Sequence, residues 1–431
     1  MSRVRRLLAH AAGDALYRTS GLLVANLVVL SGLGFVFWTV AARLFAAADV
    51  GVLSGWVAAC TLLATVGGLG LGNTLIRKLA SHDEQRRLVI TSAALLATLG
   101  AVFSLTALLA LPLVAPSRLG LGTDGGARWI VLVLVVVTAL GGLVDAALIA
   151  AQAARALLAK NLAGGLVRVG LLVPLVHGGV VGLLLAYTGG AVVAALLGWR
   201  ALVAVYPRQP RWYRPAPSLA RPHLRFSLAN YLGGVVGILP ATVVPLIVLA
   251  VLGPTPAAYF GVAFLIVGFL NFLPSSIAQA YFAHASRPDV DEVHELRKAI
   301  ATSYGVMLPA CVAFIVVAPL VLRIFGPGYA AAATTPLRIL TLAGLATALT
   351  YLIDSTLNVQ HRPLAYGAMN AVNAALVVGG VALVAHDGLT AVALAWLVAQ
   401  AASALIGVPV VRHRRTAALA LRRGRYAREG I

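Results

Sequence analysis

The sequence predicts an all-α integral membrane protein, built from about twelve transmembrane helices in two halves of six. Three observations lead to this fold class. Hydrophobic residues make up 61% of the 431 residues, only 11% are charged, and the mean hydropathy is +0.94. Soluble domains, in contrast, are about 25% charged. The apolar residues also form runs long enough to cross a bilayer, and a polar pattern recurs in the two halves of the chain.

A transmembrane helix needs about 20 apolar residues, and the sequence contains twelve such runs. They lie near residues 20–42, 51–73, 88–112, 129–151, 162–177, 180–204, 226–252, 257–281, 299–322, 336–356, 367–385 and 389–411. The stretch 162–204 is too long for one span, so the two glycines after His177 predict a turn between the fifth and sixth helices.

The segments between the spans predict the topology. With the N-terminus inside, 27 of the 33 Lys and Arg residues fall on the cytoplasmic side, among them Arg155 and Lys160, and 5 fall outside; Arg168 lies within a span. This bias follows the positive-inside rule and predicts that both termini are cytoplasmic. Residues 1–19 are expected to form an interfacial amphipathic helix rather than a cleaved signal peptide. The expected bundles are 20–204 and 226–411, joined by a basic, proline-rich cytoplasmic linker, 205–225, and followed by a basic tail, 412–431.

The charge and motif content exclude several classes of protein. The net charge of +20 comes from arginines between apolar runs rather than along one face, so it indicates contact with anionic lipid headgroups and not with nucleic acid. Cys60 and Cys311 lie in apolar runs and predict neither a disulfide nor a metal site. Gly68-x-Gly70-x-Gly72 lies in a span and lacks the Lys-Ser/Thr of a phosphate-binding loop.

An internal repeat relates the two halves. Asp145 and Asp354 lie in similar apolar contexts in the fourth and tenth spans, and Asn161 and Asn370 begin the fifth and eleventh. Seven residues after each asparagine come Arg168 and Val377, each followed two residues later by glycine. Because each half has an even number of spans, the halves keep the same orientation, which is the parallel kind of transporter repeat.

Several local patterns extend along nearly the whole chain. They are Ala41-Ala42-Arg43-Leu44, Asp49-x-Gly51, the glycines 68–72 before Arg77-Lys78-Leu79-Ala80, Val321 to Tyr329, Leu337-Arg338-Ile339-Leu340 and Gln360-His361-Arg362. In these patterns the sequence resembles the polysaccharide-biosynthesis (O-antigen and exopolysaccharide) flippase branch of the multidrug/oligosaccharidyl-lipid/polysaccharide exporter superfamily. The resemblance implies two pseudo-symmetric six-helix bundles around a central cavity, and alternating access to a polyprenyl-pyrophosphate-linked oligosaccharide.

Acidic and basic residues inside the spans are the main candidates for a functional site, because a buried charge in a membrane is costly. Asp145 and Arg168 are expected at matched depth, about 10 Å from the inner face, where they can pair. Such a pair would hold two helices together; alternatively, Arg168 binds a pyrophosphate or anionic sugar, or reaches the lipid headgroups. Asp354 has no arginine at the equivalent place. It could pair with Arg168, join a polar network with Asn370, or bind a coupling H+ or Na+.

Neutral and basic residues near the spans complete the candidate set. Asn26, Asn230 and Asn370 could contact glycan hydroxyls or form hydrogen bonds between helices. Arg18, Arg77 and Arg225 lie at inner ends of spans, where they follow the positive-inside rule or form a cationic vestibule that attracts a diphosphate.

The function expected from these features is a flippase of the bacterial cytoplasmic membrane, with no catalytic residues, no metal and no bound cofactor. Its partners would be the lipid-linked glycan, membrane lipids, and a polysaccharide polymerase or glycosyltransferases. The alternatives are a cation-coupled multidrug or small-molecule efflux carrier and a lipid II flippase. A membrane glycosyltransferase fits poorly, because every predicted outer loop is short and both span acids lie toward the inside.

Overall fold

The protein folds into long helices that form two compact units. A computed structural model describes residues 15–67, 125–205, 217–287 and 290–428, and contains no strand within them. One unit comprises Met1–Tyr231 and Gly253–Ala258, and the other Leu232–Leu252 and Tyr259–Ile431. Ten of the described helices are long and apolar enough to cross a membrane. The prediction of an all-α, multi-pass membrane protein is therefore confirmed.

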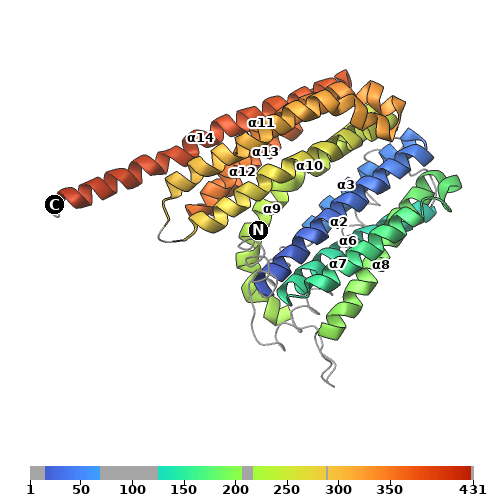
Figure 1. The fold of residues 1–431 in the computed structure, drawn as a ribbon, viewed down its shortest axis with the longest axis horizontal. Coiled ribbons are helices and arrows are strands. Elements are labelled where there is room, and N and C mark those ends of the chain that lie inside the picture. The colour runs from blue at the N-terminus through green and yellow to red at the C-terminus, as the bar shows by residue number, and fades with distance from the viewer. Residues whose placement is uncertain (1–14, 68–124, 206–216, 288–289, 429–431) are drawn as a thin grey trace, which may run out of the picture. The chain divides into compact units, whose positions relative to one another are not determined.

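The first unit contains five described helices, coloured blue to green in Figure 1. They are α2 (Ala15–Leu44), α3 (Ala47–Gly67), α6 (Gly125–Ala150), α7 (Ala154–Gly170) and α8 (Gly179–Val205), with a short 3-10 turn, η1 (Val176–Gly178), before α8. The predicted span 88–112 and most of the predicted interfacial helix, residues 1–14, lie outside the described residues. Helix α7 begins eight residues earlier than the predicted start at 162, which changes the partners of its charged residues.

The second unit contains the helices coloured yellow to red in Figure 1. They are α9 (Pro217–Leu252), α10 (Pro254–Ala285), α11 (Glu292–Phe325), α12 (Pro327–Val359), α13 (Pro363–Val384) and α14 (Leu389–Arg428), with the 3-10 turn η2 (Ala385–Asp387) before α14. Residues 217–231 of α9 and 254–258 of α10 belong to the first unit. Helix α9 begins inside the segment predicted as a linker, and α14 continues into the predicted tail.

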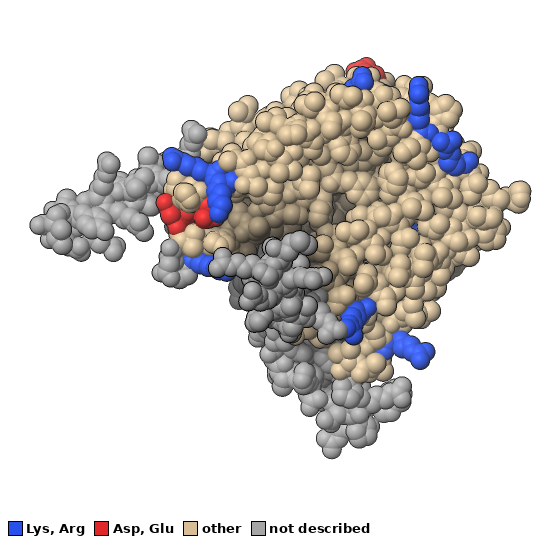
Figure 2. All heavy atoms as spheres, in the orientation of Figure 1, with Lys and Arg blue, Asp and Glu red and all other residues tan. Residues whose placement is uncertain are grey.

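Helix ends follow local chemistry. Four helices begin on proline, whose fixed φ suits the first turn and whose missing N–H is not needed there. Helix α11 instead starts after Asp291, whose Oδ1 accepts a hydrogen bond from the Val293 N–H at 2.9 Å. Many outward-facing side chains are apolar, for example Leu364, Leu383 and Leu405, which are all more than 70% exposed. Figure 2 shows few charged side chains on the visible described surface, as expected for helices that contact lipid tails.

The turns that join α6 to α7 and α12 to α13 have the same geometry. Gln152 and His361 are the two described non-glycine residues with positive φ, at 55° and 53°. Each turn is closed by matching backbone hydrogen bonds, from Ala153 N to Leu148 O and from Arg362 N to Leu357 O, both 2.9 Å. This is the six-to-one bond that ends a helix through a left-handed residue. The matching positions differ by 209 residues (361 − 152), the same interval that separates Asp145 from Asp354.

The same interval relates the packing of the surrounding helices. Helix α8 packs on α6 and α7, and α14 packs on α12 and α13. A Cβ at Gly198 would lie 2.5 Å from Val144 and 2.7 Å from Lys160. Gly407, 209 residues further on, is in close contact with Ile353 and Met369, which are the equivalents of Val144 and Lys160. Buried apolar residues also match, with Val144, Leu148 and Leu202 in one core and Ile353, Leu357 and Val411 in the other. The helices α6–α8 and α12–α14 are therefore two copies of one structural repeat.

Candidate functional site

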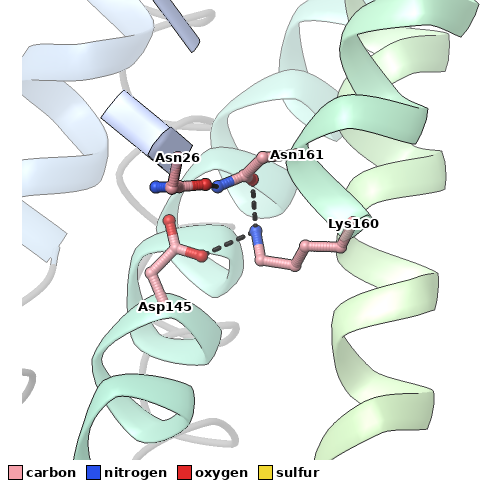
Figure 3. A network of polar contacts seen from close by, with 4 residues as sticks. All are labelled: Asn26, Asp145, Lys160 and Asn161. Carbon is pink, nitrogen blue, oxygen red and sulfur yellow. Dashed lines mark hydrogen bonds and ion pairs between the residues drawn. The ribbon is translucent and has the colours of Figure 1, made fainter. Parts of the chain in front are cut away.

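The first repeat holds its aspartate in a network of charged and amide side chains (Figure 3). Lys160 Nζ lies 2.6 Å from Asp145 Oδ1 and donates a hydrogen bond to Asn161 Oδ1 at 2.8 Å. Asn161 Nδ2 in turn donates to Asn26 Oδ1 at 2.8 Å. The network links α6, α7 and α2. The Lys160 side chain is only 4% exposed, and these contacts compensate the cost of burying its ammonium.

The predicted pairing of Asp145 with Arg168 is wrong, and the cause is the start of α7. Because α7 begins at Ala154, Lys160 lies six residues into it, while Asp145 lies five residues before the end of α6. Arg168 lies eight residues beyond Lys160, or about 12 Å further along the axis at 1.5 Å per residue. In the predicted topology Lys160 lies in a cytoplasmic loop, and it is therefore not among the predicted partners of Asp145. Its position beside Asn161 in an apolar stretch was the available signal.

Arg168 instead lies among aromatic rings. Its guanidinium carbon is 3.8 Å from the centroid of Tyr187 and 5.9 Å from that of Phe37. The rings of Trp38 and Phe37 make an edge-to-face contact, with their centroids 5.5 Å apart. Arg168 Nε is buried without a hydrogen-bond partner, and no carboxylate of the described residues forms an ion pair with Arg168. Ring faces attract a cation but do not neutralise it, so this guanidinium retains the capacity to bind an anion.

The second repeat places its aspartate at a cavity of about 320 Å³ within the second unit. Asp354 lines it, and the side-chain amide of Asn370 interacts with the Asp354 carboxylate. Helices α9, α10, α12, α13 and α14 all contribute to the wall. Its further polar residues are Asn271, Ser275, Thr347, Thr350, Asn373, Gln400 and Ser403, and its aromatic ones are Phe264, Phe272, Tyr351 and Trp396. The mixture of one acid, several amides and aromatic rings is typical of a ligand site rather than of a packed core.

Three side-chain oxygen atoms at this cavity accept no hydrogen bond from the described part of the protein. Asn271 Oδ1, Asn373 Oδ1 and Gln400 Oε1 are buried without a hydrogen-bond partner. Buried polar atoms are normally paired, so unpaired ones call for a water, an ion or a ligand. Together with the Asp354 carboxylate they form a set of acceptors. The arrangement suits a cation or a group rich in donors.

The two sites differ at one decisive position. The interval of 209 residues makes Met369 the equivalent of Lys160 and Asn370 the equivalent of Asn161. Met369 is buried and uncharged, so this position of the second repeat carries no ammonium. Gly237 lies opposite Asn370, where a Cβ would come 3.0 Å from the amide oxygen.

The remaining predicted residues have different outcomes. Asn26 and Asn161 join the network of the first repeat, and Asn370 lies at the cavity of the second. Arg18 lies in α2, and Arg225 and Asn230 lie in α9, in parts of these helices whose side chains are not described. Arg77 lies outside the described residues. Sequence reasoning missed Gln400 and Ser403, although a glutamine within an apolar span is an uncommon and visible signal.

Multi-pass helices in two units, with charged and amide groups inside the spans, are typical of a membrane transporter. Comparison with known families agrees with this class. The model of the polysaccharide biosynthesis protein family matches residues 18–283, more than half of the chain. The chain therefore belongs to that family. Its fold is that of transporters of the multidrug/oligosaccharidyl-lipid/polysaccharide exporter (MOP) superfamily. None of the curated proteins matches it.

Several solved structures share the fold at low sequence identity. An inward-facing multidrug resistance MATE family transporter of the MOP superfamily is 16% identical, with a TM-score of 0.72, covering 93% of this chain and 98% of its own. An outward-facing MATE family transporter gives 18% identity and a TM-score of 0.63, covering 94% of this chain and 96% of its own. The lipid II flippase MurJ in an inward closed conformation gives 11% identity and a TM-score of 0.69, and the match covers 91% of this chain and 87% of the flippase. At these identities the matches establish the fold, so substrate and coupling have to be inferred from the site.

Proposed function

We propose that this protein is a flippase that moves a polyprenyl-pyrophosphate-linked oligosaccharide across the bacterial cytoplasmic membrane, for assembly of cell-surface polysaccharide. The observation that carries the proposal is membership of the polysaccharide biosynthesis protein family. Similarity to a lipid II flippase supports a lipid-linked cargo, and similarity to transporters in inward- and outward-facing conformations supports alternating access. Both termini would be cytoplasmic, in keeping with the bias of Lys and Arg toward that side.

Arg168 is the proposed contact for the pyrophosphate group. A guanidinium on the face of Tyr187, with no carboxylate partner among the described residues, offers planar donors to two phosphate oxygens. Tyr187 and Phe37 lie against the guanidinium, and Trp38 packs on both of these rings. The half-buried rings of Tyr187 and Trp38 offer surfaces on which sugar rings can pack. Glycosyltransferases or a polymerase would supply and consume the cargo.

Asp354 is the proposed site of the coupling ion, H+ or Na+. Its cavity collects a carboxylate and several amide oxygens but no cationic side chain of the described residues. Binding of a cation there would favour one conformation of the transporter over another, which is the requirement for coupled transport.

A cation-coupled efflux carrier is the second candidate function. The observation that favours it is the Asp354 cavity itself, since a carboxylate flanked by Phe264, Tyr351 and Trp396 also suits an organic cation. A lipid II flippase remains the third, on the basis of the shared fold alone.

Deleting the gene distinguishes these functions. The proposal predicts that a lipid-linked oligosaccharide accumulates on the cytoplasmic leaflet and that surface polysaccharide falls. Accumulation of lipid II instead would identify the third function. Normal precursor levels combined with greater sensitivity to toxic cations would establish efflux and overturn the proposal.

The cargo site is tested by restoring the gene with substitutions at Arg168. Arg168→Ala should fail to restore surface polysaccharide, and Arg168→Lys should restore it only in part, because an ammonium lacks the planar fork of donors. Arg200, an exposed residue of α8, provides the control. Arg200→Ala should behave as the parent. Full function of both Arg168 variants, at equal protein levels, would leave Arg168 with a structural role only.

A further inference from the structure

The network of the first repeat has the composition of a cation site. A carboxylate oxygen of Asp145 and an amide oxygen of Asn161 converge on one positive group, Lys160 Nζ, at 2.6 and 2.8 Å. Asn26 fixes the orientation of the Asn161 amide by accepting its N–H (Figure 3). Carboxylate and amide oxygens are the ligands that hard cations prefer. The positive group in this case belongs to the chain itself.

The second repeat has the same aspartate and asparagine without the ammonium. Asp354 and Asn370 occupy the places of Asp145 and Asn161, while Met369 replaces Lys160. The space beside them is a cavity rather than a side chain. The two copies thus share an aspartate and an asparagine at equivalent positions, with and without a built-in positive charge, and in the second copy the Asn370 amide N–H donates to the Tyr366 carbonyl at 3.0 Å.

An ordinary buried ion pair does not account for this pattern. Such a pair serves helix packing, and apolar residues can replace both partners at little cost. In the second repeat only the lysine is replaced, by methionine, while the aspartate and the asparagine are both present. We infer that the aspartate and the asparagine bind a positive charge in both repeats, which is the Lys160 ammonium in the first and a free cation in the second.

We propose that Lys160 is a tethered cation: its ammonium fills a monovalent-cation site in the first repeat, and shortening this side chain opens that site to a free small cation such as Na+ or methylammonium. As a consequence, only the second repeat exchanges a cation during transport. The exchange of a cation at the second repeat rests on the proposed coupling role of Asp354. The cation site around Asp145 is independent of that role.

Thermal unfolding of the purified full-length chain tests the site. The midpoint is compared in NaCl, methylammonium chloride and choline chloride at equal ionic strength, choline being too large for the site. For each protein, the cation response is the rise of the midpoint in Na+ or methylammonium over that in choline. The response of Lys160→Met should exceed that of the parent by about 5 °C. The double variant Lys160→Met with Asp145→Asn should lose this gain, because the carboxylate is absent. Stabilisation by methylammonium alone would define an ammonium site, and by Na+ as well a general monovalent site.

Two outcomes would overturn the proposal. One is a Lys160→Met variant whose response to cations equals that of the parent. The other is a variant that cannot be recovered in any of the three salts, because a replaceable cation should rescue it.

The reciprocal change provides a second measurement. Met369→Lys carries an ammonium to Asp354 and should abolish whatever cation response the parent shows, while raising its midpoint in choline. A parent-like response in this variant would contradict the equivalence of the two sites. A parent protein with no cation response would remove the coupling role proposed for Asp354, but the additional response of Lys160→Met would still stand as evidence for the tethered cation.

Discussion

The first repeat pairs its aspartate with a buried lysine, whereas the second leaves its aspartate beside a cavity, although both repeats have the same helix packing and the same turn. In the first, a Cβ at Gly164 would lie 2.7 Å from the Ala194 Cβ, so α7 and α8 are in close contact there. The equivalent residues in the second are Asn373 and Ser403, and both line the cavity. The comparison teaches that a few differences, polar residues in place of small ones and methionine in place of lysine, distinguish the open polar site of the second repeat from the ion-paired network of the first.

The largest expected effect is the loss of transport when the charge of Asp354 is removed. Asp354→Asn keeps the shape and hydrogen-bonding capacity of the side chain but removes the charge that would bind the coupling ion. We expect transport in reconstituted vesicles to fall close to background, with little change in the free energy of unfolding, since no cationic side chain of the described residues loses its partner. Undiminished transport by this variant would show that coupling takes place elsewhere.

Loss of the other aspartate should act on stability. Asp145→Ala leaves the buried Lys160 without a counter-charge, and removing one partner of a buried pair costs about 3–5 kcal/mol. The Asp145 side chain is 38% exposed, so we expect the lower end of that range, about 3 kcal/mol. Chemical unfolding in detergent measures it, and Asp354→Ala is the matched variant, expected to cost less than about 1 kcal/mol. Equal costs would mean that the two sites are not as different as their geometry indicates.

The contrast between the repeats shows what could be predicted from the sequence. Apolar runs locate most of the helices, because a membrane helix has to be apolar over its whole length. The equivalence of Asp145 and Asp354 was also visible, since a repeat duplicates sequence as well as structure. The partner of Asp145 was not, because it depended on the first turns of α7, where Ala154–Asn161 includes polar residues and reads as a loop.

The cavity of the second unit could be predicted only in part. Asp354 and Asn370 were identified because they lie in the repeat. Gln400 and Ser403 lie on α14 and reach the cavity through the packing of α14 on α12, which no local pattern encodes. The stacking of Arg168 on Tyr187 likewise joins two helices at depths that the sequence alone does not determine.

The glycines of α8 and α14 provide a prediction of intermediate size. A Cβ at Gly198 would lie 2.5 Å from Val144 and 2.7 Å from Lys160, and Lys160 is held in place by two polar contacts. At Gly407 the nearest atoms are 2.8 Å away in Ile353 and 3.2 Å in Met369, a side chain that adapts readily. We expect Gly198→Ala to cost about 2 kcal/mol and Gly407→Ala about 1 kcal/mol or less, within the range for overpacking. Unfolding free energies of both variants test the order, and a larger cost at Gly407 would contradict the view that the first repeat is the more rigid.

The smallest expected effect concerns the turns, where the repeats should respond alike. Gln152 and His361 adopt positive φ, which costs a residue with a Cβ about 1 kcal/mol. Gln152→Gly and His361→Gly remove that strain but increase the entropy of the unfolded chain, which offsets part of the gain. Each variant should therefore be more stable than the parent by a few tenths of a kcal/mol, to the same extent in the two repeats. Thermal midpoints measured side by side check this, with Gln152→Val and His361→Val as controls that should be less stable, because a β-branched residue tolerates positive φ poorly. A large difference between the two glycine variants would mean that one turn has a constraint beyond its backbone geometry, and the equivalence of the repeats would then be limited to the helices.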